Sequence, residues 1–354
     1  MKRKSSTIYA IFCTLLLVAG FTSVFFFAWQ ADTPDMVKCL VGFVLGFIIT
    51  PVIHELGHVV LAKTSGFDCV YVKCFCLRFY RKNGKMKVGF ASPFAPDETQ
   101  VMPKSGGDMQ RRAVAYTIGG LTFSFILLLF TAIWAILMQI FVVPNYLLWG
   151  LLPFMGYSFL LNVAPAEYPG GKTDMAVYIG LKKGYDAEKT MLSAMEIQGQ
   201  LSEGKSFAEI DQSLYFNLPQ LCEDEPLFAV MLDLRYRYYL EKEDMENAAV
   251  CLNRLAGILD YMPIAEAEKV VAELVYMASL RGEMEIAEEN SKLCQSFLRS
   301  DNLTAKRILA AWSKANGQAE FVDALFVQAE ECMQYERIDG VKKFEQILLS
   351  RIER

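Results

Sequence analysis

The only two histidines of this chain lie four residues apart, at the ends of the pentapeptide His54-Glu55-Leu56-Gly57-His58. On an α-helix, residues four apart share one face, so the two imidazoles converge on one point and Glu55 flanks it. Two imidazole nitrogens with a neighbouring carboxylate are typical of zinc hydrolases. Zn²⁺ would be held by His54 and His58, and Glu55 would act as general base on a metal-bound water. The pattern therefore predicts peptide hydrolysis.

The pentapeptide lies inside an apolar stretch that is long enough to cross a bilayer. An ionisable side chain within hydrocarbon costs about 2.5–3.5 kcal/mol on insertion scales, so three such groups on one helical turn need a compensating interaction. A bound cation supplies that interaction. The alternatives are a chance match with ordinary packed or solvated histidines, and the relic of a metal site that no longer holds its metal.

Charge and hydropathy divide the chain into two parts. Residues 1–172 contain 15 Lys and Arg against 8 Asp and Glu, whereas the remainder contains 20 against 32. The first part holds four hydrophobic spans near the roughly 20 residues that a bilayer core requires, at about residues 8–29, 38–62, 113–143 and 146–165. We expect the first span to be a retained anchor, because its apolar run is longer than that of a typical signal peptide. The predicted fold is mainly α and polytopic, with a membrane domain over residues 1–180 and a cytoplasmic helical domain over residues 181–354.

The distribution of basic residues predicts the orientation. Ten Lys and Arg lie between the second and third spans, whereas the short connections 30–37 and 144–145 carry none. Because positively charged loops stay in the cytoplasm, both termini of this multi-pass protein of the cell membrane are predicted to be cytoplasmic. His54 and His58 then fall near the cytoplasmic surface, from which water would reach the metal.

A catalytic zinc usually has three protein ligands, and no third histidine remains. A ligand at the same membrane depth must come from the cytoplasmic end of the fourth span, where Glu167 and Asp174 are the candidates. Two prolines and a Gly pair interrupt the helix from about Pro165, and a new helix is expected to begin at Thr173 or Asp174. Irregular backbone at membrane depth is tolerated where it lines a cavity.

These residues together resemble the site-2 protease family of intramembrane zinc metalloproteases. That family pairs a His-Glu-x-x-His helix with a later Asn-x-x-Pro segment and a following Asp, to which Asn162, Pro165 and Asp174 are similar. The resemblance covers about residues 36–180 and implies that Asp174 completes the metal site. The separation of Asn162 from Asp174 is wider than in the commonest family pattern, and Met175 stands where Gly usually follows the Asp.

The resemblance also implies an endopeptidase that cleaves membrane-anchored protein substrates within or near the cytoplasmic leaflet. Asn162 would contact the substrate backbone or orient a ligand, and the alternative is an amide that only terminates its helix. Gly119-Gly120 resembles the small-residue motif by which the family packs its middle core helix. Two other functions stay open: a non-catalytic scaffold that sequesters a membrane partner, and a zinc peptidase of another membrane family that uses a downstream glutamate such as Glu167.

Residues 69–91 are predicted to form a β-hairpin at the cytoplasmic interface. Residues 70–80 are rich in β-branched and aromatic types, residues 85–90 alternate polar with apolar, and Asn83-Gly84 is a strong two-residue turn signal. An unpaired strand edge beside a zinc site could take up a peptide by strand addition and extend it for attack. The alternative is a structural hairpin that only covers the helix ends.

From about residue 185 the chain is acidic and shows apolar residues at helical spacing. Three stretches echo one another around central alanines that are 39 and 37 residues apart: 238–255 (Ala248), 280–294 (Ala287) and 315–333 (Ala324). This spacing is similar to that of a degenerate tetratricopeptide-like array, whose groove could bind the substrate or a protein regulator. The alternative is an irregular bundle without a partner.

Other chemistries find no support in the sequence. The nine cysteines form no Cys-x-x-Cys pair and are expected to be reduced thiols. The chain contains no glycine-rich phosphate loop and no basic stripe, so nucleotide and nucleic-acid partners are not expected. The expected partners are therefore the lipid bilayer, a membrane-anchored protein substrate and a regulator on the helical domain.

Overall fold

The computed structural model describes residues 3–82, 85–92, 97–104, 106–168 and 171–353. The fold is mainly helical, which confirms the expected class. The chain forms two compact units, Met1–Met102 with Asp108–Glu188, and Pro103–Gly107 with Lys189–Arg354.

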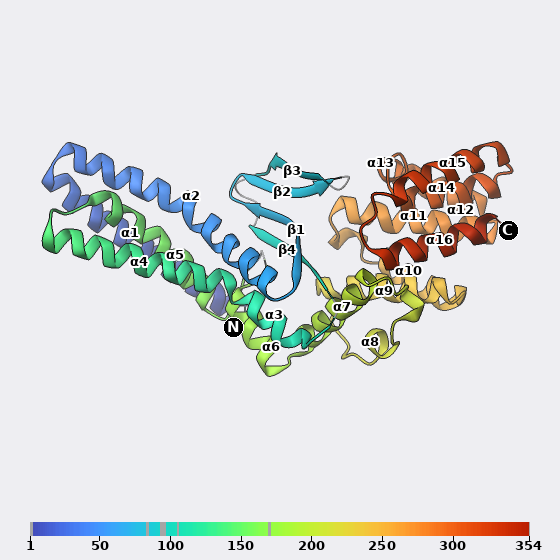
Figure 1. Ribbon diagram of the computed structural model, residues 1–354, viewed down its shortest axis with the longest axis horizontal. Helices are drawn as coiled ribbons and strands as arrows, with labels where there is room; N and C mark the ends of the chain where they lie inside the picture. Colours follow the sequence, from blue (N-terminus) through green and yellow to red (C-terminus); the bar gives the residue numbers. More distant parts are fainter. Residues whose placement is uncertain (1–2, 83–84, 93–96, 105, 169–170, 354) are drawn as a thin grey trace. The chain divides into compact units, whose positions relative to one another are not determined.

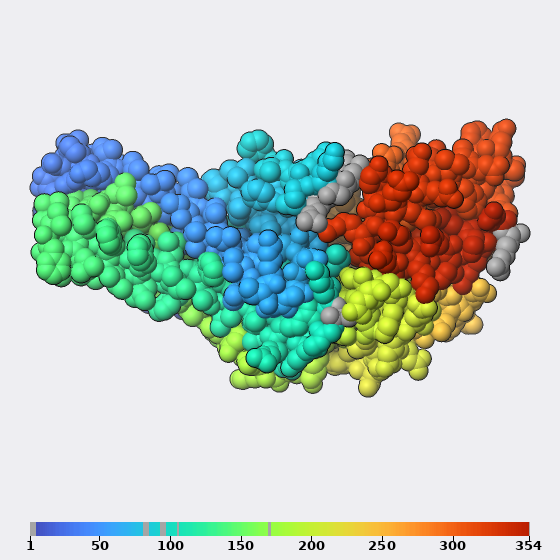
Figure 2. All heavy atoms as spheres, in the orientation of Figure 1, coloured from blue at the N-terminus to red at the C-terminus, as the bar shows by residue number. Residues whose placement is uncertain are grey.

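Four helices of the first unit are long and apolar enough to cross a membrane, as the hydropathy of the sequence predicts. These are α1 (Arg3–Ala31), α2 (Thr33–Thr64), α4 (Gly119–Phe141), which the short α3 (Met109–Thr117) precedes, and α5 (Tyr146–Val163). They lie side by side in Figure 1, and Figure 2 shows their side chains as one continuous blue and green surface. Large apolar side chains are exposed along them, for example Ile126 and Phe130. Such a surface matches a hydrocarbon surrounding better than water.

Small residues set the distances between these helices. A Cβ added to Gly42 would meet the backbone carbonyl of Leu147, and one added to Gly150 would meet that of Cys39. The backbones of α2 and α5 are therefore in contact at both points. Glycine allows helices within a bilayer to approach this closely, so that dispersion contacts hold them together.

A four-stranded sheet follows α2 directly. It contains β1 (Phe67–Cys74), β2 (Leu77–Lys82), β3 (Lys85–Phe90) and β4 (Glu98–Pro103), in the order β3-β2-β1-β4. Strands β2 and β3 are antiparallel over the segment predicted as a hairpin, from Leu77↔Phe90 to Lys82↔Lys85. The predicted turn, Asn83-Gly84, lies outside the described residues.

The first strand of that predicted hairpin is in fact two strands. The sequence predicts one strand over residues 70–80, but Phe75 has a positive φ of 52° and the chain reverses direction there, so that β1 pairs with β2. The carboxylate of Asp97 stabilises the bend by accepting hydrogen bonds from the Phe75 N–H (2.8 Å) and from the buried Lys73 ammonium (2.7 Å). A distant carboxylate of this kind cannot be recognised from local strand propensity.

The chain between α5 and the next helix is irregular, as its prolines and glycines predict. Two short strands, β5 (Glu167–Tyr168) and β6 (Gly171–Lys172), precede α6 (Asp174–Lys183). Thr173 is the N-cap of α6: its hydroxyl accepts from the Ala176 N–H and donates to the Ala164 carbonyl at 2.6 Å. The expected helix start at Thr173 or Asp174 is therefore correct, and the cap places Asp174 at the first position of the helix.

The second unit is a series of helices around one apolar core. In order they are α7 (Asp186–Ser202, which begins in the first unit), α8 (Ser213–Phe216), α9 (Pro226–Glu241), α10 (Met245–Ala256), α11 (Ile264–Arg281), α12 (Met284–Leu293), α13 (Gln295–Leu298), α14 (Leu303–Ala315), α15 (Ala319–Met333) and α16 (Asp339–Glu353). Short turns join α9 to α10, α11 to α12 and α14 to α15, each with a left-handed residue (Glu243, Gly282 or Gly317).

Each sequence echo covers the turn and the second helix of one of these pairs, but one of the three central alanines does not face the core. Ala248 and Ala287 are fully buried, whereas Ala324 is exposed. The inward face of α15 carries Val322 and Ala329 instead. Two residues correspond to about 200° around a helix, so an error of two positions moves a side chain to the opposite face. The tetratricopeptide-like repeat therefore stays a prediction.

Candidate metal centre

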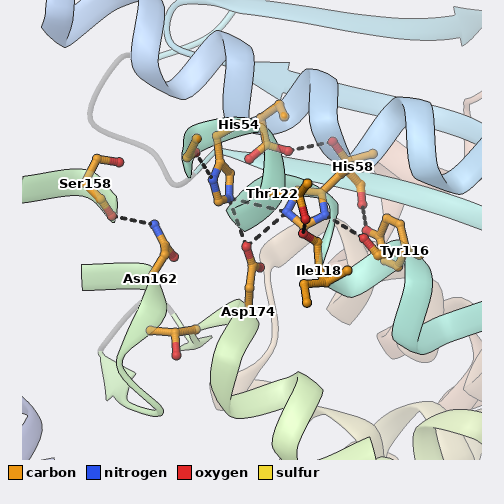
Figure 3. A network of polar contacts seen from close by, with 12 residues as sticks. His54, His58, Tyr116, Ile118, Thr122, Ser158, Asn162 and Asp174 are labelled. Atoms are coloured by element: carbon orange, nitrogen blue, oxygen red, sulfur yellow. Dashed lines mark hydrogen bonds and ion pairs between the residues drawn. The ribbon is translucent and has the colours of Figure 1, made fainter. Parts of the chain in front are cut away.

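Three potential metal ligands meet where α2 and α6 approach each other. His54 and His58 lie on the last third of α2, and Asp174 opens α6 (Figure 3). The Asp174 Oδ2 atom is 3.1 Å from His54 Nε2 and 3.3 Å from His58 Nε2. The two Nε2 atoms are 3.3 Å apart. The three ligand atoms therefore form a nearly equilateral triangle.

This triangle has the size that a small tetrahedral cation requires. With metal–ligand bonds of about 2.0–2.1 Å, two ligand atoms of a tetrahedral site are about 3.3–3.4 Å apart. Asp174 Oδ2 is buried and has no hydrogen-bond partner of proper geometry, although two nitrogens lie close to it. A shared cation would satisfy this oxygen and both imidazole lone pairs at once. The donor set therefore fits a divalent metal ion.

The electrostatic surroundings keep Asp174 ionised. Burial raises the pKa of this carboxyl group, but the adjacent His54 and His58 outweigh burial, and the pKa lies well below its ordinary value. An ionised carboxylate is the form that binds a cation. Among the described residues, His54, His58 and Asp174 are the only group of three or more His, Cys, Asp and Glu residues that could hold a metal ion.

A second layer of contacts orients the two imidazoles. The Nδ1 atom of His58 lies 3.1 Å from the backbone carbonyl of Tyr116, and the Nδ1 atom of His54 lies 3.0 Å from the hydroxyl of Ser124. A carbonyl can only accept, so Nδ1 of His58 carries a proton, and in the neutral imidazole, which is the form that binds a metal, Nε2 keeps its lone pair. Neither partner is predicted by the sequence alone, because Ser124 is one of several hydroxyl-bearing residues in its span and the Tyr116 partner is a backbone carbonyl.

Glu55 is buried beside the triangle but does not belong to it. Its Oε2 atom accepts a hydrogen bond of 2.6 Å from the hydroxyl of Thr99 in β4. The Tyr116 hydroxyl in turn donates to the Thr99 carbonyl at 2.6 Å. The sheet thus holds the carboxylate of Glu55 in one orientation next to the candidate ligands, as a general base requires.

Two glycines of α4 give the site its space. A Cβ on Gly119 would lie 2.5 Å from the Gly57 carbonyl oxygen, so the two helix backbones touch directly below the histidines. A Cβ on Gly120 would lie 2.5 Å from the Nε2 atoms of both His54 and His58. The missing side chain of Gly120 therefore leaves the volume next to the ligand atoms open.

We expect Gly120→Ala to lower the metal content of the purified protein at least about tenfold, because the added methyl group would occupy the space beside both nitrogens. Metal analysis by mass spectrometry measures this. Gly156→Ala is the matched control, since a Cβ there meets nothing within 4 Å and Gly156 also lies in one of the long apolar helices, α5. Equal metal content in the two variants would contradict the open volume inferred here.

The remaining predicted site residues lie outside the triangle. The Asn162 side chain, on the last turn of α5, donates to the Ser158 carbonyl at 3.2 Å, as a helix-terminating amide does. Glu167 lies in β5, and its N–H donates to the hydroxyl of Ser6 at 3.3 Å. Of the two candidates for third ligand, the structure brings Asp174 and not Glu167 to the histidines.

No family model, no curated protein and no solved structure matches this chain. The geometry of the site and the helices that are long and apolar enough to cross a membrane are therefore the observations that bear on function.

Proposed function

We propose that this protein is a membrane-embedded zinc endopeptidase that cleaves membrane-anchored proteins near the cytoplasmic leaflet. The observation that carries the proposal is the triangle of His54, His58 and Asp174, whose spacing suits a tetrahedral metal and whose carboxylate oxygen lacks any other partner. Three ionisable groups on one turn of the apolar helix α2, His54, Glu55 and His58, need such a reason to be there. The resemblance of the sequence motifs to those of site-2 proteases agrees with the proposal of a zinc endopeptidase.

In this proposal each residue has one role. His54, His58 and Asp174 would hold the zinc ion, which when bound makes a coordinated water acidic enough to lose a proton near neutral pH. Glu55 takes up that proton and later returns it to the leaving amine. The hydrogen bond from Thr99 engages Oε2 of Glu55, so Oε1 is the oxygen that accepts the proton.

Strand β4 is the proposed docking edge for the scissile segment. It lies at one edge of the sheet, and its Thr99 touches Glu55, so a peptide paired along this edge would pass the metal centre. A helical peptide bond is shielded by its own hydrogen-bonded turn and must be unwound before attack. Strand addition replaces the backbone hydrogen bonds that unwinding breaks. With both termini in the cytoplasm, this edge would lie at the cytoplasmic interface.

Substituting Thr99 by Val is expected to lower kcat about tenfold while zinc content and KM stay unchanged. The hydroxyl positions the base but contacts neither metal nor substrate, and one charge-assisted hydrogen bond contributes on the order of 1.5–3 kcal/mol. Thr99→Ser should restore most of the rate. Thr64→Val is the control, because that hydroxyl bonds only to carbonyls of its own helix. An unchanged kcat in Thr99→Val would remove Thr99 from its positioning role.

The experiment that tests the function is capture of the substrate in native membranes. A Glu55→Gln variant that still binds zinc should retain a membrane-anchored protein that the wild-type protein cuts. The captured protein, reconstituted with each form in vesicles, should be cleaved only by the wild type. Failure of the wild type to cleave any protein that the variant retains would overturn the endopeptidase proposal.

A non-catalytic scaffold is the second candidate, because a helical unit that could serve partner binding makes up about half of the chain. The metal distinguishes the two candidates. A purified wild-type protein without stoichiometric zinc, or a biological role that survives loss of both histidines, would favour the scaffold.

A further inference from the structure

The second unit contains a cavity that the proposed peptidase chemistry does not use. It has a volume of about 370 Å³ and lies between α9, α10 and the loop that follows α8. Its lining combines apolar side chains, Phe216, Leu218, Phe228 and Met231 among them, with polar ones, which include Arg235 and Arg254, and the polar atoms make up the larger share of the exposed wall. A concave site in which apolar side chains meet a few convergent polar groups is a usual form of a ligand site.

The two arginines are oriented by aromatic rings. The guanidinium carbon of Arg235 lies 5.7 Å from the centre of the Phe216 ring, and that of Arg254 lies 5.0 Å from the centre of the Phe228 ring. The Nε atom of Arg235 donates a hydrogen bond to the Tyr215 carbonyl at 2.7 Å. This bond fixes the guanidinium group so that its two terminal nitrogens point away from that carbonyl. Preoriented guanidinium groups favour bidentate binding of a carboxylate.

The positive charge in the cavity is poorly neutralised. Within the described part of the chain, no carboxylate pairs with Arg235, and the only carboxylate that pairs with Arg254 is that of the exposed Glu223, at 3.1 Å. Burial lowers the pKa of Arg235, and the nearby Arg254 acts in the same direction. An exposed pair such as Arg254–Glu223 contributes little and exchanges easily. A bound anion would relieve the repulsion between the two guanidinium groups.

The loop beside the cavity offers main-chain partners. Residues 218–221 lie outside helices and strands, and their backbone groups make no hydrogen bond to other described residues. Such groups can pair with the main chain of a peptide. The volume is close to the lower limit of about 300 Å³ for ligand pockets, so it suits the end of a chain better than a continuous chain.

We propose that this cavity binds the free C-terminal end of a peptide or protein whose last side chain is apolar. The terminal carboxylate lies between Arg235 and Arg254, the last side chain contacts Phe228 and Met231, and the preceding backbone pairs with the loop of residues 218–221. The α-carboxylate and the last side chain leave the same carbon atom, which matches guanidinium groups that lie beside apolar side chains, as Arg254 does beside Phe228. This proposal does not depend on cleavage at the metal centre.

Fluorescence polarisation on the full-length protein in detergent tests the proposal. The probes are fluorescein-labelled hexapeptides with a Gly/Ser leader and Leu, Phe, Met or Val at the end, each made as the free acid and as the amide. We expect at least one acid to bind at least tenfold more tightly than its amide, which equals about 1.4 kcal/mol. Arg254→Gln should remove this difference, and Glu223→Gln should tighten binding of the acid, because the competing carboxylate is gone.

Controls separate the cavity from general charge effects. Arg281→Gln removes an exposed arginine at the end of α11, outside the cavity, and should change nothing. Arg235→Lys keeps the positive charge but removes the planar guanidinium group. It should therefore weaken binding of the free-acid peptide, and it tests this position even if larger substitutions there unfold the protein. Overturning results are equal affinity of acid and amide, no binding of any probe at about 1 mM, or displacement of the acid by an amidated peptide with an internal Asp. Tighter binding of laurate than of any free-acid peptide would assign the site to a fatty acid and would also overturn the proposal.

Discussion

Glu55→Gln is expected to lower substrate cleavage by about 10²–10⁴-fold while the zinc content stays at one ion per chain. General acid–base catalysis contributes this range, and the amide cannot take up a proton. The substitution preserves the shape of the side chain, and an amide oxygen can still accept the hydrogen bond from Thr99. Because Glu55 lies outside the ligand triangle, metal binding should not change. The measurement is initial cleavage rate in vesicles, together with metal analysis of the same preparation.

Glu203→Gln is the matched control, because that carboxylate is exposed just after α7, in the other compact unit, and does not belong to the candidate metal centre. It should cleave at the wild-type rate. Activity of Glu55→Gln within a few fold of wild type would mean that another group accepts the proton. Loss of zinc together with activity would instead make Glu55 a residue that supports the metal.

His54→Ala, His58→Ala and Asp174→Asn should each weaken zinc binding by two orders of magnitude or more, whereas Glu167→Gln should leave it unchanged. Each of the first three removes one corner of a three-ligand site, and loss of a contact that merely orients a ligand already costs 10–100-fold. Glu167 lies in β5 and contributes no atom to the triangle. Competition with a zinc chelator measures the affinities.

The same variants also report on stability. A ligand that binds only the folded protein stabilises it by about 2.7 kcal/mol when present at 100 times its Kd. Added zinc should therefore raise the unfolding temperature of the wild type and of Glu167→Gln, but not that of Asp174→Asn. The reverse pattern, with zinc lost in Glu167→Gln and retained in Asp174→Asn, would make Glu167 the third ligand and would indicate a different peptidase class.

Local sequence signals predicted much of the fold correctly. Hydrophobic runs near 20 residues predicted the four long helices, because burying a backbone in hydrocarbon requires helical hydrogen bonding over that length. Prolines and glycines predicted the break after α5 and the start of α6, since these residue types restrict the backbone wherever they occur. The convergence of His54 and His58 follows from helical periodicity alone.

Contacts between distant segments could not be predicted in this way. The choice between Glu167 and Asp174 depended on how the irregular segment folds back, which Thr173 controls through its bonds to Ala164 and Ala176. The bend of β1 at Phe75 depends on Asp97, more than twenty residues further along the chain. The burial of Val322 in place of Ala324 depends on the rotation of α15 against its neighbours.

The amino-acid sequence by itself thus determined which chemistry this protein has available: two imidazoles and a carboxylate on one helical face, inside a stretch long and apolar enough to cross a membrane. Periodicity and backbone preferences are local properties, so they can be read without a fold. The third candidate ligand, the hydrogen bonds that involve Ser124, Tyr116 and Thr99, and the cavity around Arg235 and Arg254 became visible only once the helices were packed. Packing brings together residues that are far apart in the chain, and no local propensity encodes those distances.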